Sequence, residues 1–421
     1  MNEFLHNKLF RSVAASAYVN QLGTSLYNLV FIIYASTLPY KTLAVSLATV
    51  VTTIPTVFQM FTGYWADKSK NKIRATLRTR LIQIVLFGML TYFVQDKQVL
   101  TIFIVLLVIN LASDLLGEYS NGAELTILKH IVPEEKLNEA LSISTAFAQL
   151  IMIVGQAAGV ALLTLVKYNF SIIAAVNVFT FVISFMLILV KYRGLNEAVP
   201  VGTDTTENSE EREVDVGFVK NVKRMIADLR NSNGLLQLIF WFFLVNNILT
   251  VTEAVSAIGL LHSPTLWISS YSTTMALFGV TTSVGTIFGS IIRKDPLMKK
   301  SFATVTNVLL AFVMIVVVNF VVVKSVIVFF AGMFFIGYVF GKLGPRFSAM
   351  LMKNSNPKRM AITAGTVNTL IVIGGPVSQI IFLGIANLVS VQVTWITLAI
   401  VIVITVIVVL YSNAKLKTVE N

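Results

Sequence analysis

The stretch GYWADKSKNKIR, residues Gly63 to Arg74, places one acid and four bases between two long apolar runs. The 421-residue chain is otherwise 56% hydrophobic and only 12% charged, whereas soluble globular proteins contain about 25% charged residues. We therefore expect an integral membrane protein in which this stretch is a loop between two spans. The net charge of +12 then reflects the membrane, and no nucleic-acid partner is expected.

Twelve apolar segments are long enough to cross a bilayer, which takes about 20 residues in a helix. Backbone groups in lipid must be bonded within their own segment, so we expect an all-α membrane protein with twelve transmembrane helices. The first segment is too long for the apolar core of a cleavable signal peptide, which has about 7–15 residues. The predicted spans are 9–37, 42–64, 77–95, 99–125, 138–165, 170–192, 235–261, 268–292, 301–322, 325–352, 360–386 and 391–412.

The positions of the basic residues predict the orientation of the spans. If the N-terminus is inside, 28 of the 32 Lys and Arg residues lie in inner segments, and the outer loops contain only Lys41, Lys97, Lys167 and Lys324. Inner loops of membrane proteins are enriched in these residues, so both termini are expected in the cytoplasm. With its short loops, the chain is expected to be a multi-pass protein of a bacterial cell membrane.

One long hydrophilic segment divides the chain into two groups of six spans. The predicted domains are residues 1–195, a cytoplasmic linker at 196–232, and residues 233–421. Within the linker, VGFVKNVKRMIADLR has an apolar stripe at helical spacing. This stretch is expected to form a short helix that lies on the inner membrane surface or, equally, in solvent.

The two halves resemble each other in sequence. LIMIVGQAAG at 150–159 matches LIVIGGPVSQ at 370–379, an offset of 220 residues, and Gly63 has a partner in Gly289. These matches predict two pseudo-symmetric six-helix bundles, an arrangement typical of secondary transporters. Glycines in the fifth span of each half, and one proline in the fifth span of the second half, are expected to allow bending. These residues are Gly155, Gly159, Gly374, Gly375 and Pro376.

The opening stretch resembles the loop signature of the major facilitator superfamily. That signature is Gly, three residues, Asp, a base, one residue, Gly, one residue and two bases. Gly63, Asp67, Lys68 and Lys72 match it, whereas Lys70 and Ile73 replace the second Gly and a base, and Arg74 lies one position late. The resemblance implies the twelve-helix fold of that family and a conformational latch formed by Gly63, Asp67, Lys68, Lys72 and Arg74.

In this latch Asp67 would accept hydrogen bonds at the start of span 11, near Met360, and oppose that helix's dipole. For the bases, the alternative is that they only follow the rule that inner loops are positive.

A narrower resemblance covers residues 132–159, which look like the corresponding part of the drug-proton antiporter group that includes macrolide efflux proteins. The chain departs from that group in two places. Gly155-Gln156 replaces a Gly-Pro pair, and Ser113 lies about where an arginine is common.

Acidic residues inside the spans are candidates for proton coupling, because ionisable groups in lipid are costly. Asp114 and Glu118 share one face of span 4, and Glu253 is the acid in span 7. For Asp114 the alternative is a structural ion pair, and for Glu253 it is exposure at the outer mouth. Glu124 is expected to be a surface charge at the membrane interface.

Neutral polar residues form a stripe on span 1 and a shorter one on span 7. They can form hydrogen bonds with a substrate in an apolar cavity. The alternative is that they form hydrogen bonds between neighbouring helices. The chain also has 29 Phe and 13 Met, side chains that favour adaptable apolar cavities. The candidate cavity residues are Asn20, Gln21, Thr24, Ser25, Asn28, Asn246, Asn247 and Thr250.

Several chemistries are not expected from this sequence. It has no cysteine and only three histidines, so no metal site is expected. It has no GxxxxGK[ST] loop, so ATP-driven transport is not expected. We also expect no cofactor and no enzymatic activity. The preferred function is proton-coupled efflux of small amphipathic drugs such as macrolides, by a monomer in the lipid bilayer. The alternatives are a uniporter or symporter of a specific metabolite or lipid headgroup, and a scaffold or receptor that transports nothing.

Overall fold

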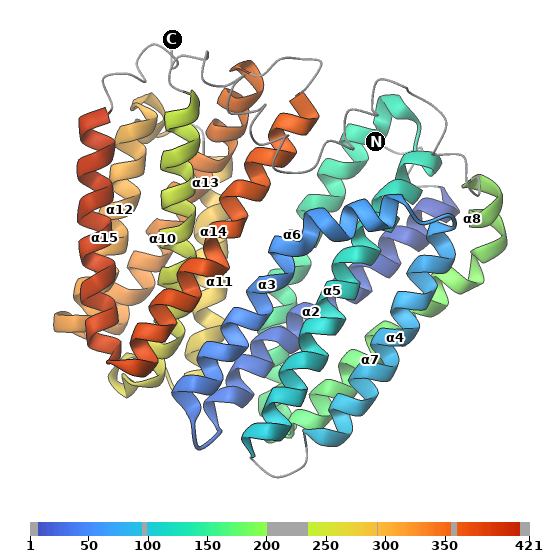
Figure 1. Ribbon diagram of the computed structural model, residues 1–421, viewed down its shortest axis with the longest axis horizontal. Helices are drawn as coiled ribbons and strands as arrows, with labels where there is room; N and C mark the ends of the chain where they lie inside the picture. Colours follow the sequence, from blue (N-terminus) through green and yellow to red (C-terminus); the bar gives the residue numbers. More distant parts are fainter. Residues whose placement is uncertain (1–6, 95–98, 200–234, 293, 355–359, 413–421) are drawn as a thin grey trace. The chain divides into compact units, whose positions relative to one another are not determined.

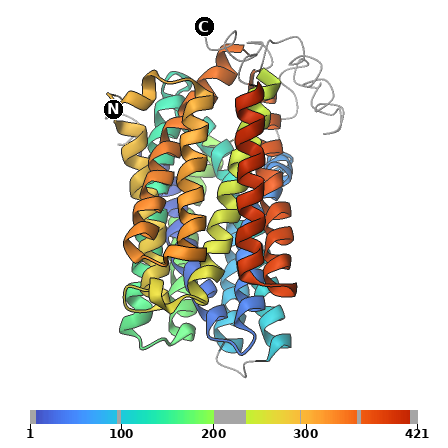
Figure 2. The same cartoon turned by 90° about the vertical axis from the view of Figure 1, so that its left-hand side faces the viewer.

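The computed structural model describes residues 7–94, 99–199, 235–292, 294–354 and 360–412. Its contacts divide the chain into two compact units, Met1–Glu207 and Asn208–Asn421. In each unit the long helices run side by side and are joined at their ends by short connections (Figures 1 and 2). The predicted linker helix falls within 200–234 and therefore lies outside the described residues.

Unit 1 consists of six long helices and a short one. Asn7 caps α2 by accepting hydrogen bonds from the amides of Leu9 and Phe10, and Asn71 and Asn169 cap α4 and α7 in the same way. The helices are α2 (Lys8–Ser36), α3 (Lys41–Asp67), α4 (Lys72–Phe93), α5 (Leu100–Ile131), α6 (Glu134–Leu165), α7 (Phe170–Val190) and α8 (Tyr192–Ala198).

Unit 2 repeats this series. Its long helices are α10 (Leu235–Leu261), α11 (Tyr271–Ile291), α12 (Phe302–Val318), α13 (Val326–Asn354), α14 (Met360–Leu388) and α15 (Val391–Ser412). A π-helical turn, η5 (Asn319–Val323), extends α12, and the short turns η3 (Pro264–Leu266) and η4 (Pro296–Lys299) lie in connections.

The helices of the two units make the same pairwise contacts. In unit 1 the first helix packs on the fifth and sixth, the second on the fourth, and the third on the fourth and sixth. In unit 2, α10 packs on α14 and α15, α11 on α13, and α12 on α13 and α15. This agreement, helix by helix, confirms the two pseudo-symmetric six-helix bundles expected from the weak sequence repeat.

Ten helical segments in the described residues are long and apolar enough to span a membrane. The two long helices outside this set are α2, whose polar stripe lowers its hydropathy, and α4, which begins with four bases within nine residues: Lys72, Arg74, Arg78 and Arg80. The predicted spans therefore coincide with the helices, and the main differences lie at their ends. The helix α5 continues to Ile131, six residues beyond the predicted end.

The stretch Gly63–Arg74 is mostly helical, contrary to the prediction of a loop. The helix α3 runs to Asp67 and α4 starts at Lys72, so only four residues separate them. The capping side chain of Asn71, which accepts from the Arg74 amide at 2.8 Å, allows α4 to start this early. Lys72 and Arg74 consequently belong to the first turn of α4.

Glycines in the fifth helix of each unit permit close approach to the first helix. A Cβ atom at Gly159 on α6 would lie 2.5 Å from the carbonyl oxygen of Leu26 on α2, and one at Gly155 would lie 2.8 Å from the Ser25 Cβ. In unit 2 a Cβ at Gly374 would lie 2.3 Å from the Asn247 side chain on α10. These glycines therefore allow close helix packing, whereas the bending predicted for them together with Gly375 and Pro376 stays a prediction.

We expect Gly159→Ala to destabilise the protein, because the new methyl group would meet the backbone of α2, which cannot rotate away. The expected loss is about 1–3 kcal/mol, seen as a lower thermal midpoint in detergent. Gly88→Ala on α4 is the matched control, since its Cβ meets nothing within 4 Å, and it should be neutral or slightly stabilising. An equal midpoint for both variants would contradict this account of α2–α6 packing.

Candidate functional site

The most distinctive polar arrangement in unit 1 is centred on Asp114 of α5. Its Oδ2 accepts hydrogen bonds from the amide of Asn28 on α2, at 3.4 Å, and from the amide of Asn110 one turn earlier on α5, at 3.3 Å. Asp114 is partly buried, and the described residues give it no cationic partner. The predicted cavity residue Asn28 and the predicted proton site Asp114 therefore lie together.

Several polar oxygens on α2 and α5 are buried without a partner. Among the described residues, these oxygens are Asn20 Oδ1 and Asn28 Oδ1 on α2, and Asn110 Oδ1 and Glu118 Oε2 on α5. Glu118, one turn after Asp114, interacts with the side chains of Gln59 and Asn121. Buried polar atoms are normally bonded, so each of these oxygens can accept a hydrogen bond from water or from a ligand.

A second acid on α5, Glu124, has a different environment from the one predicted. It is buried and forms an ion pair of 2.8 Å with Arg80 of α4, so the prediction of a surface charge is wrong. Arg80 also donates to Gln83, whose amide reaches the carbonyl of Ser113 at 3.0 Å. The Ser120 hydroxyl donates to the same Glu124 oxygen at 3.4 Å. A buried charge needs such neutralisation, which is why the pair joins α4 to α5.

The signal for this ion pair was present in the sequence. Arg80 lies inside the predicted span 77–95, where an isolated base would be very costly, and Glu124 lies in the next span. Counting Arg80 with the inner loop bases concealed the pairing.

The remaining polar residues of α2 divide into two groups. Gln21 and Thr24 are partly buried, as expected for residues that line a cavity. Ser25 is buried, donates to the Gln21 carbonyl at 2.6 Å and packs against Gly155, so its position is explained by helix contact.

In unit 2 the polar residues of α10 are divided in the same way. Asn247 is buried against α14, where it donates to the Phe243 carbonyl at 2.7 Å and accepts from Ser378 at 3.3 Å. Asn246 and Thr250 are partly buried, and Glu253 is exposed with no hydrogen-bond or ion-pair partner among the described residues. Thr250 donates to the Asn246 carbonyl at 2.9 Å and faces Gly375 of α14. Asn246 and Glu253 can therefore contact a ligand, whereas Asn247 and Thr250 lie at the contact of α10 with α14.

A third charged cluster lies in unit 2 at the connection between α11 and α12. Asp295 forms an ion pair of 3.2 Å with Lys342 of α13 and a hydrogen bond with Tyr338, and its Oδ1 caps η4 by accepting from Leu297 N. Burial alone would raise the pKa of Asp295, but the bonds from Tyr338, Leu297 and Lys342 outweigh burial and hold the pKa below its ordinary value. Sequence analysis did not single out these residues.

The predicted latch residues are only partly visible. Gly63 and Asp67 lie in the last turns of α3, and the burial and contacts of these two residues are outside what the structure describes. Lys72 is buried and donates to the Ser69 carbonyl at 3.4 Å, whereas Arg74 is exposed and donates to Tyr192 of α8 at 2.8 Å. The latch role of Asp67 and Lys68 stays a prediction.

Comparison with known proteins decides the family. The sequence model of the Major Facilitator Superfamily matches residues 13–379. The chain belongs to this superfamily. No curated protein matches the sequence.

Solved transporter structures share the fold at low sequence identity. A bacterial homologue of the human lysosomal transporter Spinster, in an inward-facing and occupied conformation, is 11% identical, with a TM-score of 0.70 over 100% of this chain and 99% of that one. A peptide transporter in complex with sulfate is 10% identical, with a TM-score of 0.74 over 100% and 96%. A bacterial homologue of the human drug peptide transporters is 12% identical, with a TM-score of 0.66 over 98% and 99%. These structures share the fold, and membership of the Major Facilitator Superfamily indicates a multi-pass membrane transporter in preference to a scaffold or receptor.

We expect Arg80→Gln to destabilise this transporter strongly, because it leaves the Glu124 carboxylate buried without a counter-charge. Breaking a buried pair from one side costs about 3–5 kcal/mol, which should be visible as lost folded yield and a lower thermal midpoint. The double variant Arg80→Gln with Glu124→Gln removes both charges and should recover most of the loss. Arg11→Gln, which removes an exposed base on α2, is the control. A double variant as unstable as the single one would contradict the pairing.

The Asp295 cluster predicts a pH dependence of stability. Since the pKa of Asp295 is lower in the folded protein than its ordinary value of about 3.9, this group stabilises the fold fully above that value. The stabilisation is lost as the pH falls through the folded-state pKa. The midpoint gap between the parent and Asp295→Asn should therefore be constant above about pH 5 and shrink toward pH 3. In a Tyr338→Phe background, which lacks one donor to Asp295, the Asp295→Asn substitution should lower the midpoint by less. A midpoint gap that does not change with pH would refute the account of the Asp295 cluster.

Proposed function

We propose that the protein is a secondary active transporter that exports small amphipathic compounds, macrolides among them, in exchange for protons by alternating access. The observation that supports this proposal best is the environment of Asp114. A carboxyl group inside a membrane span, held by two amides and by no base among the described residues, is free to change its charge. Glu124 is not free to do so, because Arg80 neutralises it.

The two asparagines suit both protonation states of Asp114. In the described arrangement their amide nitrogens donate to the carboxylate, while their Oδ1 atoms have no partner. If the carboxyl group gains a proton, it becomes a donor, and a half-turn of either amide would present an oxygen to accept it. Asn28 lies on α2 and Asn110 on α5, so loading of a proton would change the bond between these two helices.

The proposed substrate class rests on the polar residues of each unit taken by itself. On α2 of unit 1 the partly buried Gln21 and Thr24 offer neutral hydrogen-bonding groups, and on α10 of unit 2 Asn246 does the same, about two turns before the negative charge of Glu253. Such groups suit molecules with a large apolar surface, a few polar groups and, where charged, a positive charge. The resemblance of residues 132–159 to drug-proton antiporters supports the same class and suggests a role in antibiotic resistance.

The cellular setting is part of the proposal. The excess of bases in the predicted inner segments supports a cytoplasmic position for both termini, and the short loops support a bacterial cell membrane. We take the transporter to act as a monomer with one proton-coupled pathway.

A susceptibility panel tests the substrate class directly. The transporter would be expressed in an efflux-deficient bacterial host, which would be exposed to macrolides, lipophilic cations and neutral detergents, with and without a proton uncoupler. Higher tolerance that the uncoupler abolishes is expected for amphipathic compounds. Unchanged tolerance across the panel would favour the alternative, a uniporter or symporter of a specific metabolite or lipid headgroup.

We expect Asp114→Asn to abolish transport driven by an imposed pH gradient in inside-out vesicles, because the site can no longer exchange a proton. Substrate binding should persist, since an amide retains the shape and hydrogen-bonding capacity of the carboxyl group. Glu197→Gln, which removes an exposed acid on α8, is the control for the loss of one negative charge. Glu253→Gln tests the second acid in the same assay. Normal gradient-driven transport by the Asp114→Asn and Glu253→Gln double variant would overturn the coupling assignment.

A further inference from the structure

A basic cavity lies in unit 1 at the start of α4, away from the Asp114 site. Its volume is about 340 Å³, and its lining includes three bases, Lys70, Arg74 and Arg78, together with the hydroxyl-bearing residues Ser69, Thr79 and Tyr119. No acid lines it. Arg78 and Lys70 are exposed, and neither has an ion-pair partner among the described residues. The cavity therefore has an uncompensated positive charge.

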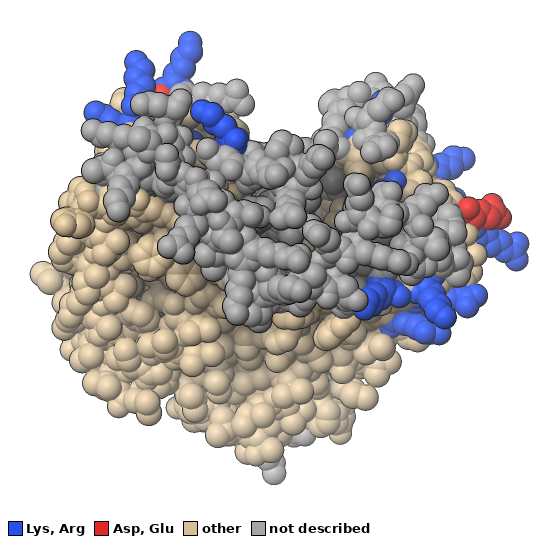
Figure 3. Space-filling model, turned by 45° about the horizontal axis from the view of Figure 1, so that its top comes forward, with Lys and Arg blue, Asp and Glu red and all other residues tan. Residues whose placement is uncertain are grey.

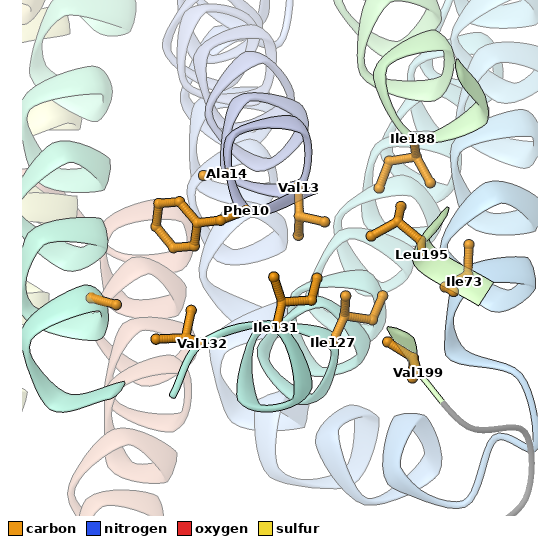
Figure 4. Close-up of a cluster of buried hydrophobic side chains, with 11 residues drawn as sticks. Phe10, Val13, Ala14, Ile73, Ile127, Ile131, Val132, Ile188, Leu195 and Val199 are labelled. Atoms are coloured by element: carbon orange, nitrogen blue, oxygen red, sulfur yellow. The ribbon is translucent and has the colours of Figure 1, made fainter. Parts of the chain in front are cut away.

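The position of these bases is fixed by the surrounding structure. Asn71 caps α4 and also donates to Asn196 of α8 at 3.0 Å, and Arg74 Nε donates to the Tyr192 hydroxyl at 2.8 Å. Beneath them an apolar cluster holds α8 against the start of α4, as Figure 4 shows for Ile73, Ile188, Leu195 and Val199. The cavity is thus built before any ligand arrives, which lowers the entropic cost of binding.

The outer face of α4 continues from these bases into apolar side chains. Arg74, Arg78, Ile82, Val85 and Met89 lie within about 80° of one another around the helix, because α-helices turn about 100° per residue. Ile82 also lines the cavity, and Ile82, Val85 and Met89 are 46%, 49% and 50% exposed. One face of α4 therefore presents positive charge at its first turns and an apolar strip along the following turns.

Charge distribution on the visible surface agrees with this arrangement. Figure 3 shows the described Lys and Arg side chains toward the end of each unit that comes forward, whereas the surface below is almost entirely uncharged. A boundary of this kind is expected where a membrane protein passes from the headgroup layer to the hydrocarbon.

We propose that this cavity binds the phosphate headgroup of an anionic phospholipid whose acyl chain lies along Ile82, Val85 and Met89. The guanidinium groups of Arg74 and Arg78 donate to phosphate oxygens, as arginine forks do in other proteins. The start of α4 adds the positive end of a helix dipole. A soluble phosphate compound would use the bases alone, whereas the apolar strip that begins inside the cavity fits a ligand that has both a headgroup and a chain.

Binding can be measured on the full-length transporter in a neutral detergent. The readout is the rise in thermal midpoint on titration with dioctanoyl phosphatidylglycerol, since a ligand that binds only the folded state stabilises it. Dioctanoyl phosphatidylcholine, which has no net charge, and inorganic phosphate are the comparison ligands. The variants are Arg78→Gln alone, Arg74→Gln with Arg78→Gln, and Ile82→Ser with Met89→Ser. Lys299→Gln with Lys300→Gln, two exposed bases in unit 2, is the matched control.

The expected result is saturable binding of phosphatidylglycerol that weakens on the order of fivefold for each arginine removed. The serine variant should also weaken it, the lysine control should leave it within about twofold, and added salt should reduce it. Equal binding of the two lipids, or equal losses in the arginine variants and the lysine control, would overturn the proposal. If inorganic phosphate stabilises the protein as well as phosphatidylglycerol does, and the serine variant is without effect, the site binds soluble phosphate and the lipid assignment is wrong. Because no transport is measured, this outcome is independent of the proposed export activity.

Discussion

The free-energy cost of burying a charge in an apolar helix bundle determines which partners the acidic side chains of this protein have. A charge at membrane depth needs a counter-charge, a set of hydrogen bonds or access to water. Glu124 meets this requirement through Arg80. Asp295, in the connection between α11 and α12, is paired in a similar way with Lys342 and Tyr338 of α13. Asp114 differs, because its two hydrogen bonds come from neutral amides. The same physical constraint thus separates acids that are paired with a base from an acid that is held by neutral groups.

The two units have equivalent helix contacts but different charged residues on equivalent helices. In both, the first helix packs on the fifth through glycines, at Gly159 in one unit and Gly374 in the other. The fourth helix of unit 1 contains the acids Asp114, Glu118 and Glu124, whereas its counterpart α13 contains Lys342 and Arg346 and no acid. The matching helix contacts of the two units are therefore not accompanied by matching charges, and the acids of the fourth helix occur in unit 1 alone.

Span positions and the repeat were predictable because they depend on long-range averages of hydropathy, and a few residues of error hardly change such an average. The ends of α3 and α4 were not predictable in this way, because a single capping side chain, Asn71, moved the start of α4 into the charged stretch. Asn28 and Asp114 were each singled out as polar residues within spans, but their contact depends on how α2 packs on α5 and was not predicted. The Arg80–Glu124 and Asp295–Lys342 pairs join residues 44 and 47 positions apart, and only the packing of the helices shows that they meet.

Helix packing also determines which polar side chains are covered by a neighbouring helix and which can form hydrogen bonds with a ligand. Ser25 and Asn247 have the same chemistry as Thr24 and Asn246, yet the first two lie against a glycine of the neighbouring helix. The other two remain partly buried, one position away around their helices. A difference of one residue turns a side chain by about 100°, which is enough to move it from a helix contact to an accessible surface. The glycines of α6 and α14 therefore do more than permit close packing: because they determine which faces of α2 and α10 are covered, they also determine which faces stay uncovered within each unit.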